Sequence, residues 1–325
     1  MCTAATYVTK DHYFGRNLDL EFSYNQKVTI VPRNYEFNFR KVKPMKSHYA
    51  MIGMAFVVEN YPLYYDATNE KGLSMAGLNF PGNADYKQEV EGIDNIAPFE
   101  FIPWISGQCA TIAEVKSLLD RINLINIDFS KELPLSPLHW IISDKEVSIT
   151  VESVKAGLKI YDNPIGILTN NPTFDIQMFN LNNYINITKE VPENRFSSKL
   201  DLDIYSRGMG AIGLPGDLSS SSRFVKAAFT KLNSISGTSE PESISQFFHI
   251  LGSVNQERGC VRLAKDTYEI TIYSSCCNTD KGIYYYKTYE NSQITGIDLY
   301  NENLDSQILI SYPLISGQHI KMQNR

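Results

Sequence analysis

Cys2 is the first residue of the chain whose type and position could support chemistry. It follows Met1, and a small second side chain permits removal of that methionine, which would leave Cys2 with both a thiol and a free α-amine. An unperturbed α-amine has a pKa of about 7.7–8.0 and a thiol one of about 8.5, so the amine can accept the thiol proton near neutral pH. One residue would then serve as nucleophile and base. Position alone favours an accidental cysteine, and no signal sequence supports lipidation of Cys2.

The segment Gly15-Arg16-Asn17-Leu18-Asp19 supplies charged partners for Cys2. Strand-like runs at 3–8 and 13–17, separated by a polar turn, predict a hairpin that returns this segment beside the N-terminus. Arg16 could then stabilise a thiolate, and Asp19 could hold the α-ammonium. Side-chain alternation places Arg16 and Asp19 on opposite faces, so we expect a break or bulge if both charges reach one site. An ordinary surface Arg–Asp pair is the alternative.

The elements that would position these residues come in alternating blocks. Short runs rich in β-branched, aromatic or other apolar residues predict strands, and apolar residues at i, i+3 and i+4 predict helices. Hairpin-sized spacing between strands, with helices grouped in blocks, predicts antiparallel sheets covered by helices, an α+β class. The predicted strands are 3–8, 13–17, 27–32, 49–57, 63–65, 73–78, 138–143, 147–154, 158–161, 165–168, 268–273, 283–286 and 294–299, and the predicted helices are 96–109, 111–122, 174–184, 220–232 and 243–254.

Domain organisation follows from length and the lack of a linker. A chain of 325 residues could hold two domains or one large one. Because no linker or internal repeat stands out, we expect one domain over residues 1–325. The stretch 182–213 is the least regular, and we expect it to project as a loop or arm. Thr111 is a predicted helix N-cap, whereas the serine run 219–222 taken alone is typical of a linker.

Composition excludes several classes of protein. The hydrophobic fraction of 43% is typical of a globular chain. The net charge of −6, with no basic cluster, argues against nucleic-acid binding. The longest nearly continuous apolar run, 49–58, is about half of what a bilayer crossing needs, so we expect no membrane insertion. No basic-then-apolar segment precedes Cys2, and we therefore expect a cytoplasmic protein.

The other cysteines do not form a metal or disulfide pattern. Five cysteines include no C-x-x-C pair and the five histidines are scattered, so a metal site has little support. Cys276 and Cys277 follow a strand-like run, and we expect both to be buried free thiols. A papain-like pair of Cys109 and His139 is conceivable, but no local motif supports it.

Several motifs follow one another along the chain, namely Met1-Cys2-Thr3, Gly15-Arg16-Asn17-Leu18-Asp19, Asn69-Glu70-Lys71-Gly72-Leu73, Gly77-Leu78-Asn79-Phe80-Pro81, Leu168-Thr169-Asn170-Asn171-Pro172-Thr173-Phe174, and Gly213-Leu214-Pro215-Gly216-Asp217 followed by Ser222-Arg223-Phe224. In this order and spacing they closely resemble the choloylglycine hydrolase family, which contains bacterial conjugated bile-salt hydrolases and penicillin V acylases. The resemblance covers nearly the whole chain, through Lys281-Gly282-Ile283-Tyr284-Tyr285-Tyr286. Within the family pattern the serine run 219–222 is a helix start.

The resemblance implies the N-terminal nucleophile hydrolase fold, a four-layer αββα arrangement. It also implies a catalytic set in which Cys2 is the nucleophile, Arg16 and Asp19 position and polarise it, and Arg223 completes the polar network. The Asn170 side-chain amide and the backbone N–H of Asn79 would hold the oxyanion. For the two asparagines, ordinary turn positions are the local alternative. Neither a metal nor an organic cofactor is implied.

The implied reaction is hydrolysis of the amide between a bile acid and glycine or taurine through a Cys2 thioester. The resemblance places Asn at position 79 in bile-salt hydrolases, whereas penicillin V acylases tend to carry Tyr. A steroid needs a broad apolar pocket, and the matching positions are Leu18, Tyr24, Val58, Tyr65, Phe129, Leu133 and Leu138. Core packing is the alternative for these side chains. A penicillin V acylase and a non-catalytic lipid binder with unprocessed Cys2 remain open. The resemblance also implies a homotetramer, with the 182–213 arm contributing to assembly.

Overall fold

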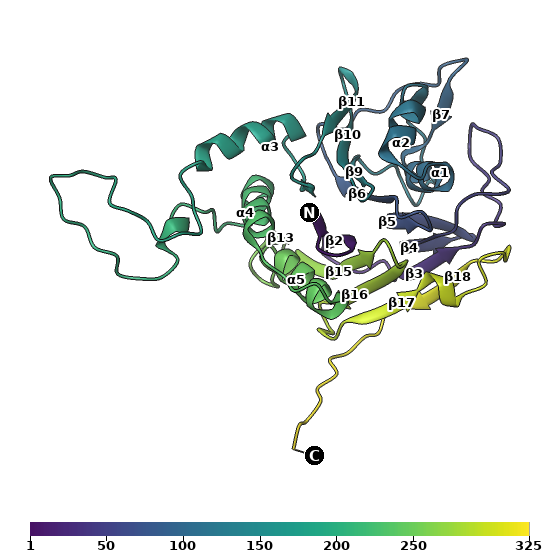
Figure 1. Cartoon of the computed structure of the whole chain (residues 1–325). Helices are drawn as coiled ribbons and strands as arrows, with labels where there is room; N and C mark the ends of the chain where they lie inside the picture. Colours follow the sequence, from purple (N-terminus) through teal and green to yellow (C-terminus); the bar gives the residue numbers. More distant parts are fainter. Residues whose placement is uncertain (325) are drawn as a thin grey trace.

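Two antiparallel sheets lie face to face at the centre of the computed structural model, which describes residues 1–324 (Figure 1). The central strands are covered on both faces. Strand β2 (His12–Leu20), for example, is buried over its first eight residues. A strand with side chains packed on both faces needs apolar or fully paired residues at every position, and this explains why the segment lacks a simple apolar–polar alternation.

The first sheet joins the two ends of the chain. It has six strands in the order β12-β1-β2-β15-β16-β17. Strands β2 and β15 pair although they are separated by most of the sequence. The remaining bounds are β1 Cys2–Val8, β12 Ile167–Leu168, β15 Ile270–Asn278, β16 Ile283–Thr288 and β17 Thr295–Asp298.

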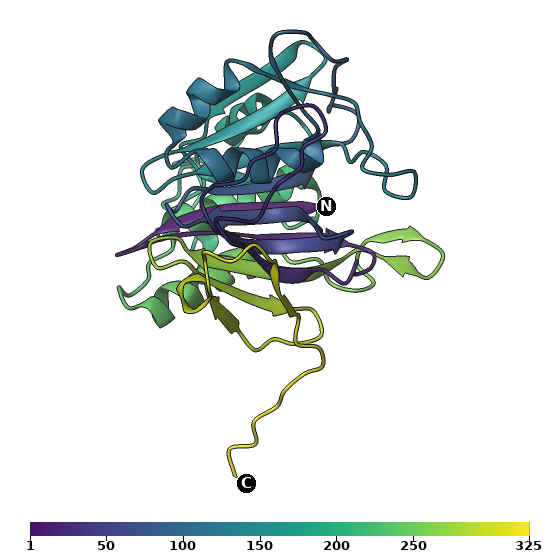
Figure 2. The same ribbon diagram turned by 90° about the vertical axis from the view of Figure 1, so that its right-hand side faces the viewer.

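The second sheet has eight strands in the order β11-β10-β9-β6-β5-β4-β3-β18. Its members are β3 Lys27–Val31, β4 Met51–Val58, β5 Tyr61–Asn69, β6 Ser74–Asn79, β9 Leu138–Ser143, β10 Ser148–Val154, β11 Gly157–Asp162 and β18 Ile310–Pro313. Two small pairs lie outside the large sheets. They are the parallel pair β7 Asp94–Ile96 with β8 Ile122–Leu124 and the hairpin β13 Arg262–Ala264 with β14 Thr267–Tyr268, which stands out from the sheets in Figure 2.

Helices cover the outer face of each sheet. Helices α1 and α2 pack on the eight-stranded sheet, while α4 and α5 pack on the six-stranded sheet (Figure 1). The helices are α1 Phe101–Gln108, α2 Ile112–Leu119, α3 Phe174–Asn180, α4 Ser220–Asn233 and α5 Glu240–Gly252, with 3-10 turns η1 Pro98–Glu100, η2 Leu181–Tyr184, η3 Met209–Ala211 and η4 Leu299–Asn301. Within residues 1–324, none of these helices has the length and hydropathy that a membrane span requires.

The buried side chains form two clusters that correspond to these layers. One cluster fills the space between the two sheets and continues between the six-stranded sheet and helices α4 and α5. The other packs the outer face of the eight-stranded sheet against α1 and α2. The predicted α+β class and the four-layer αββα order are therefore confirmed. The predicted burial of Cys276 and Cys277 as free thiols on β15 is also confirmed.

Local capping signals locate the helix starts well. Thr111 caps α2, accepting a hydrogen bond from the backbone N–H of Glu114, and Ser219 caps α4 by accepting one from Ser222. The helix predicted over 96–109 starts later than expected. Ile96 ends β7, and a 3-10 turn that begins with Pro98 precedes α1, because the Glu100 carboxylate accepts the N–H of Ala97 and tightens this turn.

The chain between η2 and η3 leaves the sheets. Residues 185–208 contain no helix or strand and extend well away from the rest of the molecule (Figure 1). The base of this loop is closed by a hydrogen bond from the N–H of Thr188 to the carbonyl of Gly210. Many of its apolar side chains are exposed, including Phe196 and Tyr205. We refer to residues 185–208 as the arm.

Gly15 shows why the motif around Arg16 begins with glycine. A Cβ built at Gly15 would lie 2.0 Å from the carbonyl oxygen of Ser275 on β15. Backbone cannot yield as a flexible side chain does, so we expect Gly15→Ala to lower the free energy of unfolding by about 3 kcal/mol. Gly252→Ala is the matched control, because its Cβ would meet nothing within 4 Å. Urea unfolding of both variants measures this effect, and equal stability of the two would contradict the packing argument.

Candidate active site

The first hairpin sets Cys2 beside the Arg16 motif. In the register of β1 and β2, Cys2 lies opposite Leu18 and Ala4 lies opposite Arg16. Side chains of directly opposed residues in an antiparallel pair project from the same face. The thiol of Cys2 therefore shares the face that carries Arg16 and Leu18, which packs toward the eight-stranded sheet. Cys2 is buried, with 3% of its surface exposed.

Arg16 is a fully buried cation next to that thiol. Its Nη1 donates to the carbonyl oxygens of Tyr65 at 2.9 Å and Gly77 at 2.5 Å, both in the facing sheet. Burial lowers the pKa of Arg16, but attraction to Cys2 and to three other acidic side chains, Asp66 among them, outweighs it, and the net pKa is raised. The guanidinium therefore stays charged and supplies a fixed positive field at the sulfur.

Asp19 occupies the opposite face of β2. Its Oδ1 accepts a 2.7 Å hydrogen bond from the Thr271 hydroxyl, while Oδ2 lies 3.9 Å from Nη1 of Arg223. Burial raises the pKa of Asp19, and the charge of Arg223 opposes that rise. Asp19 Oδ2 makes no hydrogen bond within residues 1–324.

Arg16 and Asp19 lie on opposite faces of β2, as side-chain alternation predicts, and β2 itself contains no break. Strand β2 pairs regularly with β1 as far as Asp19, whose N–H donates to the carbonyl of Met1. The irregularity lies in the partner strand, where the register of β15 shifts between Thr271 and Tyr273. The two charges instead approach the end of β1 from opposite faces, with Arg16 on the thiol side and Asp19 on the helix side.

Arg223 ties the N-terminal strand to helix α4. It lies in the first turn of that helix, and its Nη1 donates to the Cys2 carbonyl at 2.5 Å and the Thr3 hydroxyl at 2.6 Å. Its Nη2 donates to Oδ1 of Asn170 at 2.7 Å. Burial lowers the pKa of Arg223, and the nearby Asp19 opposes this decrease.

Asn170 lies in the loop after β12 and is held by four hydrogen bonds. Its Oδ1 accepts from the Cys2 N–H at 2.8 Å as well as from Arg223, and its backbone N–H donates to the hydroxyl of Ser220. Its Nδ2 donates to the carbonyl of Asn79 at 2.7 Å. An amide nitrogen carries two hydrogens, and Nδ2 makes no second bond within residues 1–324. One N–H of Asn170 is therefore free beside Cys2.

The backbone of Asn79 faces the same space. The next residue, Phe80, donates its N–H to the carbonyl of Pro137 at 2.7 Å. Because every second residue of an antiparallel strand bonds to a given neighbouring strand, the N–H of Asn79 does not bond to β9. In a strand, N–H and C=O of one residue point the same way, and the Asn79 carbonyl points to Asn170. Its N–H therefore points there too. On that side β5 pairs with β6 only as far as Asp66 opposite Ala76, which leaves this edge open.

Met1 continues the first strand in this structure. Its carbonyl accepts from Asp19, and its terminal ammonium contacts the buried carboxylate of Glu269. The nitrogen of Cys2 is therefore an amide N–H, which has no lone pair for a proton. Removal of Met1 would convert this nitrogen to an amine that stays next to Asn170 Oδ1.

The predicted pocket residues divide into two groups. Leu18 lies opposite Cys2, the Tyr65 carbonyl binds Arg16, and Leu138 lies opposite Asn79, so these three adjoin the candidate active site. The other four lie on strand ends and loops, and they make no hydrogen bond to the site residues within residues 1–324. Tyr24 packs on Phe56, Val58 ends β4, Phe129 packs on Tyr61 and Phe99, and Leu133 lies in the loop before β9.

Asp66 is a buried residue of the candidate active site that could not be identified from the sequence. Its carboxylate accepts from the hydroxyls of Tyr273 at 2.8 Å and Tyr284 at 2.7 Å. Burial raises the pKa of Asp66, and the nearby Arg16 opposes that rise. Asp66 thus provides a countercharge for Arg16 from strand β5 of the facing sheet. Its signal was a lone acidic residue directly after the mostly apolar run 61–65.

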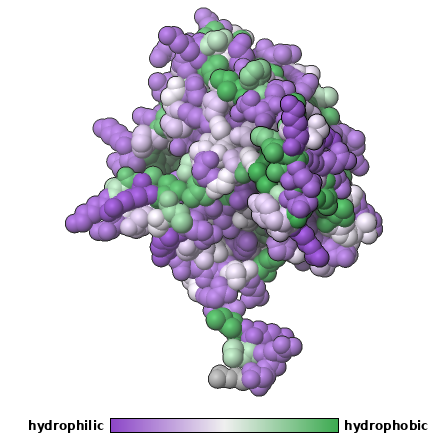
Figure 3. All heavy atoms as spheres, turned by 90° about the vertical axis from the view of Figure 1, so that its left-hand side faces the viewer, coloured by the Kyte–Doolittle hydropathy of each residue, from purple (hydrophilic) through white to green (hydrophobic). Residues whose placement is uncertain are grey.

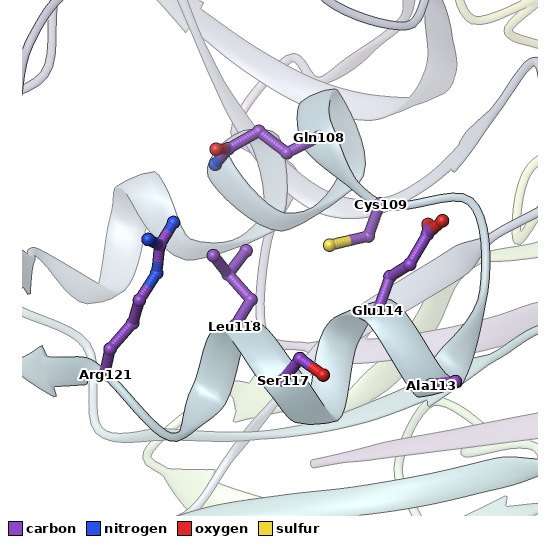
Figure 4. A pocket seen from close by; sticks show the side chains of 7 residues that line it. All are labelled: Gln108, Cys109, Ala113, Glu114, Ser117, Leu118 and Arg121. Carbon is purple, nitrogen blue, oxygen red and sulfur yellow. The ribbon is translucent and has the colours of Figure 1, made fainter.

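One surface hollow is lined by none of the residues around Cys2. It is formed between α1 and α2 and contains Cys109 and Glu114 (Figure 4). Burial raises the pKa of the Cys109 thiol to about 12, which removes it as a nucleophile at neutral pH. The ring nitrogens of His139 are bonded to Glu152 and the Thr169 carbonyl, so the papain-like pair does not form. Within residues 1–324, no group of three or more metal-ligating side chains is present.

The buried site therefore surrounds the thiol and the amide nitrogen of Cys2 with two guanidinium groups and two N–H donors. A family model described as linear amide C–N hydrolases, choloylglycine hydrolase family, matches residues 2–312. The chain belongs to the choloylglycine hydrolase family. The predicted membership is confirmed, and the chain is thus an enzyme of the linear amide hydrolase class.

Members of the family with assigned names match over nearly the full length. A bile salt hydrolase/transferase of Lactiplantibacillus plantarum is 61% identical over 316 residues, which cover 97% of this chain and 98% of the relative. A bile salt hydrolase/transferase of Clostridium perfringens is 41% identical, with 96% of each chain covered.

Solved structures of family members and of a more distant hydrolase share the fold. A variant of the conjugated bile acid hydrolase from Clostridium perfringens has a TM-score of 0.92 at 40% identity and covers 100% of both chains. A penicillin V acylase from Agrobacterium tumefaciens has a TM-score of 0.73 at 19% identity, covering 97% of this chain and 92% of its own. The second likeness is one of fold, and together they confirm the N-terminal nucleophile hydrolase fold.

The free N–H of Asn170 makes a direct prediction. Asn170→Ala removes this donor and the acceptor of Arg223, and we expect kcat to fall by about 10²–10³-fold. Asn34→Ala is the matched control, because the Asn34 side chain donates to the Asp305 carbonyl at the surface and makes no hydrogen bond to the site. Steady-state kinetics of the two variants measure the difference. Equal kcat values for both would remove Asn170 from the oxyanion site.

Proposed function

We propose that this enzyme is a conjugated bile-salt hydrolase that cleaves the amide between a bile acid and glycine or taurine. Cys2 attacks the amide carbonyl, forming a C–S bond and a tetrahedral oxyanion. Collapse of this oxyanion breaks the C–N bond, and the amino acid leaves as an amine after taking a proton from the Cys2 α-ammonium. Water then attacks the thioester, giving the free bile acid and regenerating the thiol.

The charged groups around Cys2 support the roles proposed for its thiol and its α-amine. Arg16, buried beside the thiol, stabilises the thiolate. Asp19 and the Oδ1 atom of Asn170 receive the α-amine once Met1 is gone, because both are acceptors at the end of β1. Arg223 fixes Asn170 and neutralises Asp19.

The two N–H donors support the acyl-transfer step. The Asn79 backbone N–H and the second Nδ2 hydrogen of Asn170 point into the same space beside Cys2. Donors fixed in a buried site stabilise a developing oxyanion without reorganising during the reaction. This arrangement suits a tetrahedral intermediate on an amide carbonyl, whichever acyl group the amide carries.

The choice of a bile acid as acyl group rests on one observation above the others. The relatives that match nearly the whole chain at 61% and 41% identity carry bile-salt hydrolase names, whereas the penicillin V acylase shares only 19%. The apolar pocket is proposed to consist of Leu18, Tyr24, Val58, Tyr65, Phe129, Leu133 and Leu138. Burying about 200–300 Å² of steroid surface there would contribute about 5–8 kcal/mol before binding costs.

The test compares substrates on one enzyme preparation. Glycocholate, taurocholate and phenoxymethyl penicillin are each incubated with protein whose N-terminus is Cys2 by intact mass. Release of glycine or taurine, with little hydrolysis of the penicillin, is the expected result. Penicillin hydrolysis alone would move the assignment to the acylase. No hydrolysis with retained binding of cholate would favour the non-catalytic binder.

We also propose that the arm assembles this chain into a homotetramer. In the single chain, the arm exposes several apolar side chains to solvent, among them Ile185, Val191, Phe196, Ile204 and Tyr205. Apolar patches are visible on the face of the molecule from which the arm extends (Figure 3). Exposed apolar surface of this kind is typical of an interface. Light scattering on the full chain and on a variant with Phe196→Ser and Tyr205→Ser tests this, and a monomeric full chain would overturn it.

The five cysteines of the chain are all unpaired, Cys276 and Cys277 being neighbours on one strand. Unpaired thiols are typical of a reducing compartment. We therefore propose a cytoplasmic location, which fractionation of the producing cells would test.

A further inference from the structure

The two proposed oxyanion donors come from segments that are distant in sequence. Asn79 ends strand β6, and Asn170 lies 91 residues further along, in the loop after β12. Oxyanion stabilisation depends on the distance between two such donors, and a displacement of about 1 Å can cost 10²-fold in rate. Two hydrogen bonds link these segments directly, one from the Asn170 side chain to the Asn79 carbonyl and one from the Asn171 side chain to the Pro81 carbonyl, and a buried residue links them again.

That residue is His139, on strand β9. It is fully buried and lies opposite Leu78 in the β6–β9 register. Its imidazole stacks on the ring of Phe80, with ring centroids 4.1 Å apart and planes inclined by 7°. Phe80 directly follows Asn79. One side of the imidazole is thus fixed against the segment that carries the first donor.

The ring nitrogens of His139 hold the segment that carries the second donor. Nε2 lies 2.8 Å from the carbonyl oxygen of Thr169, the residue before Asn170. A carbonyl can only accept, so Nε2 carries the hydrogen. Nδ1 faces Oε1 of Glu152 at 3.0 Å, and the same oxygen accepts the N–H of Phe174 at 3.0 Å. The pair therefore holds the Asn170 loop at its start and at its end.

We propose that His139, oriented by Glu152, is a positioning residue that sets the spacing of the two oxyanion donors in the proposed hydrolysis. The inference rests on the proposed function, because the spacing matters only if an oxyanion forms between Asn79 and Asn170. His139 touches neither Cys2 nor Arg16 by any hydrogen bond within residues 1–324. Its effect should therefore fall on the transition state and leave the nucleophile unchanged.

His12 provides the matched comparison. It is also buried and also bonded through both ring nitrogens, with Nδ1 2.9 Å from the Thr279 hydroxyl and Nε2 3.3 Å from the Ser143 hydroxyl. It lies at the opposite end of β2 from Asp19 and contacts neither donor segment. A purely structural role of a buried histidine would show in His12 and His139 variants alike.

The experiment uses four variants of the Met1-free enzyme. His139→Leu removes the hydrogen bond to Thr169, while His139→Gln keeps a side-chain N–H able to reach that carbonyl. In His139→Leu/Glu152→Gln the unpaired buried carboxylate is also removed and an acceptor for the Phe174 N–H is kept, so that folding is preserved. His12→Gln is the control. Each is measured for glycocholate kcat and KM, for Tm, and for iodoacetamide alkylation of the N-terminal peptide.

We expect His139→Leu and the double variant to lower kcat by about 100-fold. The KM and the alkylation rate of Cys2 should stay near those of the unsubstituted enzyme, and His139→Gln should recover part of the kcat. His12→Gln should lower Tm and leave kcat unchanged. Full kcat in the double variant would overturn the inference, as would parallel losses of kcat and Cys2 alkylation. An unsubstituted enzyme that alkylates at Cys2 but releases no glycine would instead show that the proposed function fails, and the inference with it.

Discussion

Replacing Cys2 by alanine should abolish hydrolysis of glycocholate, lowering kcat by about 10⁵–10⁶-fold, while the protein stays folded. The expected size follows from losing a nucleophile that acts together with its own base, since such units fail as a whole when one member is removed. The fold should survive because alanine fills most of the space of a buried cysteine and the sulfur makes no hydrogen bond within residues 1–324. Glycine release and the thermal unfolding curve are the two measurements.

Cys109→Ala is the control for this substitution. Cys109 is buried to the same degree as Cys2, and the raised pKa of its thiol keeps it protonated at neutral pH. Its replacement should change neither kcat nor KM. Retained turnover in Cys2→Ala would remove Cys2 from the mechanism, and loss of activity in both variants would point to damage of the fold.

Retention of Met1 should also abolish turnover, although every side chain of the site is intact. An amide nitrogen cannot accept the thiol proton, whereas a free α-amine with an ordinary pKa of about 7.7–8.0 can. In addition, Met1 holds the backbone N–H of Asp19 and contacts Glu269, so it fills space at the end of β1. A precursor with a protease-cleavable leader fused to Cys2 gives both forms from one preparation.

The uncut precursor should release no glycine, and the same sample should gain full activity on cleavage that exposes Cys2. The iodoacetamide reaction of Cys2 provides the control, because it should become faster on cleavage as the thiol acquires a neighbouring base. Equal turnover before and after cleavage would mean that another group takes the proton, and the role given to the α-amine would be lost.

Four buried charges surround the nucleophile, and their placement explains how they coexist. Arg16 is attracted by Cys2 and by Asp66 of the facing eight-stranded sheet, while Asp19 and Arg223 face each other on the helix side. Each cation thus has a carboxylate on its own side of β2. Removing one partner of a buried pair leaves an uncompensated charge, at a typical cost of about 3–5 kcal/mol. The network is therefore as much a requirement of the fold as of the chemistry.

Much of the fold could be predicted from local patterns. The hairpin of β1 and β2 follows from short strand-like runs and a polar turn, and the start of α2 follows from Thr111 as its cap, whereas the serine run at the start of α4 was assigned to a helix only through the family resemblance. Strand β18 escaped prediction because Ile310–Pro313 is short and half-exposed, and it forms only by pairing with β3. Its stabilising contacts are distant in sequence, where local patterns carry no information.

Only part of the candidate site could be predicted, because its other contacts also join segments that are distant in sequence. The motifs identified Cys2, Arg16 and Arg223 as a set, and alternation correctly placed Arg16 and Asp19 on opposite faces of β2, but the register shift in the partner strand β15 could not be predicted. Asp66 and Glu269 join the site only through the fold. Asp66 is on β5, which faces β2, and Glu269 lies at the junction of β14 and β15, which faces Met1. The free N–H of Asn79 exists only because β5 stops pairing with β6 beyond Asp66. None of these relations has a local sequence signature.

The central claim is that Cys2 carries the bile acid during turnover. The most direct test is to mix the Met1-free enzyme with glycocholate, quench with acid within the first turnovers, and map the modified peptide by mass spectrometry. The account predicts one cholyl group as a thioester on the peptide that begins at Cys2, accompanied by stoichiometric glycine. Glycine release with an unmodified Cys2 and the cholyl group on another residue would contradict it.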